Sequence, residues 1–182
     1  MKELSLNILD ITENSVKAKA TLTEIRITEL NDIRTLQIKD DGVGMSEETR
    51  LAVTDPFYTT RKTRSVGLGI PLLKLAAEQT GGTISIISKQ ADDVDPTHGT
   101  TVTAIFYKNH LDFTPLGDVI SSIVTLIMGH PDTDFLFLHE TDGGVVSLDT
   151  RELREVLEGV PLDNFEVISW IKENLAEQYA SI

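Results

Sequence analysis

The chain has 182 residues, 40% hydrophobic and 25% charged, an ordinary balance for a globular protein with its own core. A formal net charge of −13 argues against the clustered cations that bind nucleic-acid phosphates or anionic lipid. Without cysteine, the chain has no disulfides or thiolate metal sites. Because no apolar stretch approaches the ~20 residues that span a bilayer, we expect a cytoplasmic protein without nucleic-acid or membrane partners.

Hydrophobic periodicity and turn residues divide the first part of the chain into helices and strands. Asn31-Asp32 is typical of a tight turn between two strands, and Gly81-Gly82 is typical of a helix end. The predicted elements are a helix at residues 4–19, strands at 23–30 and 34–39, a short helix capped by Ser46, a helix at 68–80, and strands at 83–88 and 100–107.

The remainder has its own set of predicted elements. A helix is expected at residues 117–128, followed by a hairpin of residues 134–139 and 145–148. Asp149 with Glu152, and Asp163 with Glu166, match capping boxes that open two more helices. We therefore expect a first unit of residues 1–110 and a C-terminal α+β annex of residues 111–182 packed on it.

Asp10 and Asn14 lie one turn apart on one face of the first predicted helix. The side-chain oxygen of Asn14 suits Mg²⁺, which takes oxygen ligands and keeps phosphate oxygens in its shell. The Asp10 carboxylate suits a general base that orients or deprotonates a water aimed at a γ-phosphate. A solvated polar face shared with Glu13 is the alternative for either residue taken alone.

Asp40 ends a predicted strand, and Gly42 and Gly44 follow it. A buried carboxylate accepts hydrogen bonds but cannot donate them, so Asp40 suits the exocyclic amino group of adenine and would repel the carbonyl of guanine. The two glycines let the backbone pass close to a base. Taken alone, the motif is equally typical of a simple Asp-Gly turn.

Gly67-Leu68-Gly69 leads into the helix at residues 68–80. The free N–H groups and the positive dipole end of a helix N-terminus bind phosphates. Gly67, Leu68 and Gly69 are therefore candidates for contact with a nucleotide triphosphate.

Thr60, Arg61 and Lys62 belong to the densest cationic run of an acidic chain. This run is a candidate lid over a triphosphate, with a solvated basic loop as the alternative. Thr100, after Gly99 on a late strand, is a candidate hydroxyl beside the base, with strand-edge chemistry as the alternative.

Taken together and in this order, the motifs resemble the Bergerat-fold ATPases, the histidine-kinase-like (GHKL) family that includes DNA gyrase, heat-shock chaperone ATPases, histidine kinases and mismatch-repair proteins. Glu13-Asn14-Ser15 looks like the mismatch-repair and gyrase form, and residues 57–70 look closer to the histidine-kinase form. The resemblance covers about residues 4–107. It implies an α+β fold, a Bergerat-type α/β sandwich whose mixed, mostly antiparallel sheet has helices on one face.

The resemblance also implies roles for individual residues. Asn14 would hold Mg²⁺ and Asp40 would read adenine. Gly67 and Gly69 would contact phosphates, and Thr100 would support the base. The cofactors implied are ATP and Mg²⁺.

Three positions depart from the family pattern. Asp10 stands where hydrolysing members usually have Glu, Ser65 where the glycine-rich motif usually begins with Gly, and Arg61 where Lys often follows Thr-Thr. None of these changes removes a feature needed for ATP binding, but the shorter carboxylate of Asp10 is expected to slow hydrolysis.

The leading hypothesis is a stand-alone Mg·ATP-binding protein that acts as a kinase or as a nucleotide-dependent regulator of a protein partner in trans. The alternatives are a trans-acting anti-sigma-type protein kinase for Ser or His, and a nucleotide-sensing adaptor with negligible turnover. Because the sequence begins almost at the first helix, we expect no upstream phosphoacceptor helix pair. His110 has phosphoacceptor-like spacing to Thr114-Pro115, but Leu111 replaces the acidic neighbour that would serve as a base.

Overall fold

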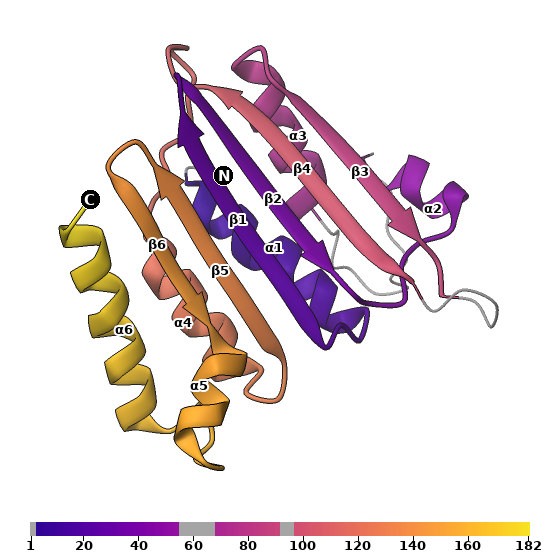
Figure 1. Cartoon of the computed structure of the whole chain (residues 1–182). Coiled ribbons are helices and arrows are strands. Elements are labelled where there is room, and N and C mark those ends of the chain that lie inside the picture. Colours follow the sequence, from indigo (N-terminus) through magenta and orange to yellow (C-terminus); the bar gives the residue numbers. More distant parts are fainter. Residues whose placement is uncertain (1–2, 55–67, 92–96) are drawn as a thin grey trace.

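The structure is a computed structural model that describes residues 3–54, 68–91 and 97–182. Six strands form one sheet in the order β3-β4-β2-β1-β5-β6, and a layer of helices covers one face (Figure 1). All neighbouring strands pair antiparallel except β1 and β5, which run parallel. The elements are α1 (Leu4–Lys17), β1 (Leu22–Leu30), β2 (Ile33–Asp40), α2 (Glu47–Ala52), α3 (Gly69–Gln79), β3 (Thr83–Lys89), β4 (Gly99–Tyr107), α4 (Val119–Gly129), β5 (Asp134–Thr141), β6 (Gly144–Asp149), α5 (Thr150–Leu157) and α6 (Phe165–Ala180).

The expected α+β sandwich with a mixed, mostly antiparallel sheet is therefore confirmed, including the placement of α1 and α3 on one face. Side chains alternate along the central strands: Ile25 and Ile27 of β1, and Leu36 and Ile38 of β2, point into the core. Helix α1 buries Leu4, Ile8, Ile11 and Ser15 at the helical spacing that faces the sheet.

The predicted turns have the backbone geometry that their residues favour. Asn31 and Asp32 have φ values of 50° and 60°, and they join β1 to β2 in a two-residue hairpin. A turn of this kind needs positive φ at both positions, which Asn and Asp tolerate better than most residues. Ser46 caps α2 as expected, because its side chain accepts a hydrogen bond from Thr49 N.

Residues 111–182 extend the same sheet. Strand β5 pairs in parallel with β1, from Leu22 opposite Asp134 to Glu29 opposite Thr141, and β6 forms the outer edge. One hydrophobic core runs through both parts and includes Phe135 and Phe137 of β5. The described helices are all too short or too polar to cross a lipid bilayer.

The cap of the last helix differs from the expected capping box. Asn164, not Asp163, is the N-cap of α6, and its side chain accepts a hydrogen bond from Glu166 N at 2.9 Å. The helix thus begins one residue later than the Asp163/Glu166 spacing predicts. Both Asn and Asp are good caps, so local preference does not decide between adjacent positions. Asp149 caps α5 as expected.

A buried polar cluster around Glu29 joins β1 to the strands and helix on either side. Arg34 of β2 and Lys108 place nitrogens 2.8 and 2.9 Å from the Glu29 carboxylate. Nε2 of His139 on β5 lies 3.5 Å from the same group, and Nδ1 of His139 is 2.8 Å from the Tyr179 hydroxyl of α6. The cluster therefore brings the charged side chains of the first part of the chain against His139 and Tyr179 of the second.

The His139 ring, together with Lys108 and Arg34, holds the pKa of the Glu29 carboxyl at about 2, against the opposing effect of burial. Arg34 and Lys108 contribute most to this lowered pKa, because the 3.5 Å between His139 and the carboxylate is too long for an ordinary hydrogen bond. Arg34 is itself fixed by a hydrogen bond to Thr114 O at 2.8 Å and by stacking on Phe113. Losing the carboxylate would leave this buried guanidinium without its ion partner.

Glu29→Gln is expected to lower the free energy of unfolding at pH 7 by about 3–5 kcal/mol, because breaking a buried ion pair leaves the remaining charge without its partner. A depressed folded-state pKa gives stability that is complete above the ordinary value near 4.5 and is lost as pH falls toward 2. Urea denaturation from pH 7 to pH 3 measures both effects. The exposed Glu78→Gln is the control, and equal stability and equal pH slopes in the two variants would contradict this role of Glu29.

Candidate functional site

The Asp40 carboxylate is buried at the end of β2, with 9% of the residue exposed. Oδ1 accepts hydrogen bonds from Gly42 N at 2.9 Å and Thr100 N at 3.2 Å. Oδ2 accepts one from the Ser15 hydroxyl at 2.8 Å. A carboxylate offers about four acceptor positions, so these three partners leave one open on Oδ2. The group is fixed in place and still able to accept from a ligand.

The segment after Asp40 is held against α1 and the start of β4. Val43 N donates to Ala18 O at 2.9 Å, just after the end of α1. The ring of His98 places Nδ1 2.5 Å from Gly42 O. The backbone around the two glycines is therefore ordered by its own contacts before any ligand is bound.

Gly42 and Gly44 are required by backbone packing in this structure. A Cβ on Gly42 would lie 2.8 Å from Ala18 O, and one on Gly44 would lie 1.9 Å from Lys89 O. Gly44 also has a φ of 68°, which disfavours other residues. The glycines thus allow the close approach of chain to chain that shapes this end of the sheet.

Thr100 lies opposite Asp40 in the β2–β4 ladder. Its hydroxyl is 2.9 Å from the Ser88 hydroxyl, which in turn accepts a hydrogen bond from Met45 N at 2.8 Å. The predicted residues Asp40, Gly42, Gly44 and Thr100 are therefore brought together at one end of the sheet.

Asp10 lies against the head of α3. A Cβ on Gly69 would be 2.8 Å from Asp10 Oδ2, so only a glycine fits beside this carboxylate without a shift. Leu68, the N-cap of α3, makes no side-chain cap hydrogen bond. Asn14 is exposed one turn along α1 from Asp10.

Helix α1 connects the two groups of predicted residues. Asp10 lies beside Gly69 at the start of α3, and Ser15 donates a hydrogen bond to Asp40 at the end of β2. Asn14, between them in the sequence of α1, is exposed. Thr60, Arg61, Lys62 and Gly67 lie outside the described residues. Within the described ranges, no group of three or more His, Asp or Glu side chains is arranged to hold a metal ion.

Sequence reasoning missed three residues that shape this region. Ser15 holds Asp40, His98 holds the Gly42 carbonyl, and Ser88 joins Thr100 to the glycine segment. Ser15 was findable, because helical periodicity turns the residue after Asn14 toward the sheet. Ser88 and His98 carry no local signal, since their partners are more than ten residues away in sequence.

Curated relatives match about half of the chain or less. The heme sensor protein HssS of Staphylococcus saprophyticus is 30% identical over 102 residues, 54% of this chain and 21% of that protein. The CAI-1 autoinducer sensor kinase/phosphatase CqsS of Vibrio cholerae is 33% identical over 66 residues, 36% of this chain and 10% of that protein. The chain thus spans about a fifth or less of the length of these relatives.

Two solved structures share the fold. The MutL ATPase domain of Aquifex aeolicus complexed with ADP has a TM-score of 0.53 at 16% identity, with 87% of this chain and 70% of that chain covered. The N-terminal domain of a DNA repair protein has a TM-score of 0.58 at 15% identity, with 82% and 53% covered. At these identities the likeness shows the fold alone. The two structures cover 82% and 87% of this chain, so the likeness in fold extends beyond residue 110.

The family assignment rests on the sequence of the first part of the chain. Residues 2–110, more than half of the chain, match the model of one family over the α1 helix, the Asp40 segment and the head of α3. By this match the chain belongs to the histidine kinase-, DNA gyrase B-, and HSP90-like ATPases and carries their ATP-binding domain.

Proposed function

We propose that the chain binds Mg·ATP between α1, the Asp40 segment and the head of α3, and acts as a kinase or nucleotide-dependent regulator of a protein partner. The observation that carries the proposal is the Asp40 carboxylate, buried and fixed by three donors with one acceptor position left open. An ionised carboxylate in this state accepts from the amino group of adenine and repels the carbonyl oxygen of guanine. Adenine selectivity therefore follows from the orientation of one side chain.

The phosphate end of the proposed site lies at the head of α3, beside Asp10 in the middle of α1. The N-terminus of α3 would supply N–H groups and a positive dipole end for phosphate oxygens. Asn14, exposed one turn along α1 from Asp10, would supply an oxygen ligand for Mg²⁺ bound with the nucleotide. We also propose that Gly67 and Gly69 contact the phosphates at this helix. A lid over the triphosphate would be formed by Thr60, Arg61 and Lys62.

Asp10 is the proposed general base. Its carboxylate lies beside Gly69, next to the proposed phosphate position, and is exposed to solvent. From there it can orient a water toward the γ-phosphate. An aspartate reaches less far than the glutamate usual in hydrolysing relatives, so slow turnover is expected.

Calorimetric titration with Mg·ATP and Mg·GTP tests binding and base selectivity, and no heat with millimolar Mg·ATP would overturn the proposal.

A reaction assay then distinguishes a kinase, an ATPase and a nucleotide-sensing regulator by three different outcomes. With labelled ATP and cell extract, a labelled partner supports a Ser or His kinase acting in trans. Free phosphate alone supports an ATPase. Tight binding without turnover supports a nucleotide-sensing regulator, which the short Asp10 side chain favours.

Asp40→Asn is expected to weaken ATP binding by about 1–3 kcal/mol, because one partner of a charge-assisted hydrogen bond in a buried site is lost. The amide oxygen can still accept from Gly42 N and Thr100 N, so the thermal midpoint should change little. Calorimetry and thermal unfolding are run together, with the exposed Asp132→Asn as control. Unchanged affinity in both Asp40→Asn and Asp40→Ala would remove Asp40 from the site.

Asn14→Ala is expected to remove the Mg²⁺-dependent part of ATP affinity and to leave the fold intact, because the side chain is exposed. ATP affinity is measured with Mg²⁺ and with EDTA for both proteins. If the parent chain binds ATP equally well under the two conditions, Asn14 has no metal to hold and this role is wrong.

Asp10→Asn is expected to lower basal ATP hydrolysis by about 10²-fold, the lower range for loss of a general base, without weakening ATP binding. Asp10→Glu, which restores the longer reach, is expected to raise turnover. Phosphate release at saturating ATP measures both. Hydrolysis by Asp10→Asn at the parent rate would assign Asp10 to the solvated face of α1.

A further inference from the structure

The negative charge of the chain is concentrated after the ATP-binding domain. Residues 2–110 contain 13 Lys and Arg against 15 Asp and Glu, a net charge of −2. Residues 111–182 contain 3 against 14, a net charge of −11. This part of the chain therefore presents a strongly acidic surface that the nucleotide site does not account for.

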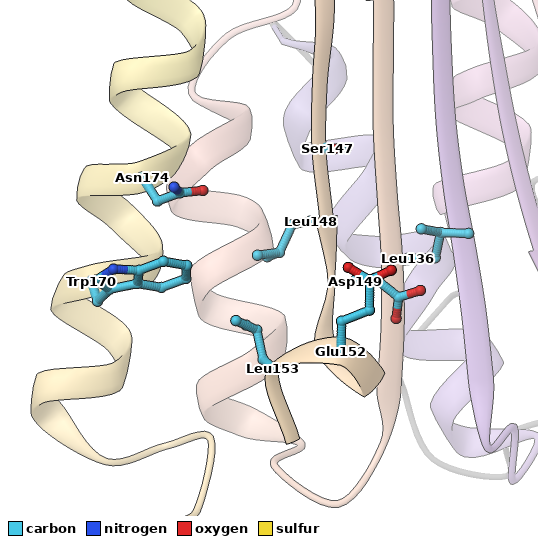
Figure 2. Close-up of a pocket in the computed structure, with 8 residues that line it drawn as sticks. All are labelled: Leu136, Ser147, Leu148, Asp149, Glu152, Leu153, Trp170 and Asn174. Atoms are coloured by element: carbon cyan, nitrogen blue, oxygen red, sulfur yellow. The ribbon is translucent and has the colours of Figure 1, made fainter. Parts of the chain in front are cut away.

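A pocket lies at the outer edge of the sheet within this acidic part (Figure 2). Trp170 and Asn174 line it from α6, Leu148 from β6, and Leu153 and Glu152 from α5. Trp170 is the only tryptophan of the chain and is 50% exposed. Its indole N–H has no hydrogen-bond partner among the described residues. An aromatic side chain that is half in water and has an unused donor is typical of an interface residue.

Carboxylates surround the exposed face of Trp170. Glu166 and Glu173 lie one turn before and one turn after it on α6, and Glu152 lines the pocket from α5. All three are exposed and make no ion pair with any described residue. The acidic rim is therefore not neutralised within the described part of the chain.

Both arginines of this part of the chain are already engaged. Arg151 is paired with Asp149 at 2.6 Å, and Arg154 with Asp134 at 2.8 Å. Neither arginine is free to balance the rim, and with Lys172, the third cation of residues 111–182, counted, this part of the chain still has a net charge of −11. The pocket combines an apolar and aromatic floor with an uncompensated negative rim.

The free edge of β6 does not invite strand addition beside this pocket. The Gln178 amide donates to Ser147 O at 3.0 Å, and Ser147 N donates to Gln178 Oε1 at 2.8 Å. The outward backbone groups in the middle of β6 are thus occupied by a side chain. A partner must therefore dock here through its own side chains.

We propose that this pocket binds a protein segment in which an aliphatic or aromatic anchor is flanked by Lys or Arg residues. The anchor packs on Trp170, Leu148 and Leu153, and the flanking cations pair with Glu152, Glu166 and Glu173. A second copy of the chain is disfavoured, because two such acidic faces repel each other. The proposal does not depend on nucleotide binding, since it uses none of the residues of that site.

The test is selection from a random peptide library displayed on phage, with the full chain as bait. Enriched peptides should carry an apolar residue flanked by Lys or Arg, and synthetic copies should shift the fluorescence of Trp170. No enrichment above empty support, or enriched peptides without basic residues, would overturn the proposal. Concentration-dependent sedimentation without peptide would instead assign the surface to self-association and would also overturn it.

Variants of the chain test whether the peptide binds at this pocket. Trp170→Ala should weaken the selected peptides at least about tenfold, as expected for an aromatic anchor. Glu152→Lys should weaken them several-fold and reduce the salt dependence of binding. Glu78→Lys, on α3, is the charge-matched control and should bind like the parent, and Mg·ATP affinity should be unchanged in all three. Peptide binding that survives both Trp170→Ala and Glu152→Lys would place the site elsewhere.

Discussion

Strand β1 is hydrogen-bonded along both edges, antiparallel to β2 and parallel to β5, and this double pairing makes one sheet of the whole chain. A parallel neighbour needs a crossover connection, and the segment that contains α4 supplies it between β4 and β5. The Glu29 cluster lies at the end of β1 and involves β2, β5 and α6. Burial of apolar side chains brings the two parts of the chain together but does not by itself select a register of β5 on β1, because the hydrophobic effect is non-directional. The charged and polar groups of the Glu29 cluster meet in one register only.

Helix α1 converts that sheet into a site. Its buried face packs on the sheet between α3 and α4, so its rotation about its axis is determined by Leu4, Ile8 and Ile11. Once this face is buried, Ser15 reaches Asp40, Asp10 meets Gly69, and Asn14 remains exposed between them. The position of each polar group on α1 therefore depends on the packing of the apolar ones. The same packing explains why Gly69 cannot carry a side chain.

The two ends of the sheet have different surface chemistry. The part of the sheet that contains β2 and β4 belongs to the nearly charge-balanced residues 2–110, and its Asp40 carboxylate is buried. The β6 edge carries exposed carboxylates around the half-exposed Trp170. Gln178 blocks the outward groups of Ser147, which limits edge-to-edge association at the one place where the sheet ends beside the pocket. A protein that binds nucleotide at one end and a basic segment at the other would have two separate surfaces on one rigid sheet.

Local sequence patterns are enough to predict most helices and strands, the turns and the family of this chain. Alternating and helical hydrophobic patterns predict the strands and helices. The positive φ values at Asn31 and Asp32 follow from their residue types. The order of the motifs indicates the ATP-binding domain. These features are local, or are read along the chain in order. The tertiary structure alone decided the parallel pairing of β5 with β1, the Glu29 cluster and the roles of Ser88 and His98. Each of these depends on contacts between residues far apart in the chain, and a single sequence carries no local pattern for such contacts.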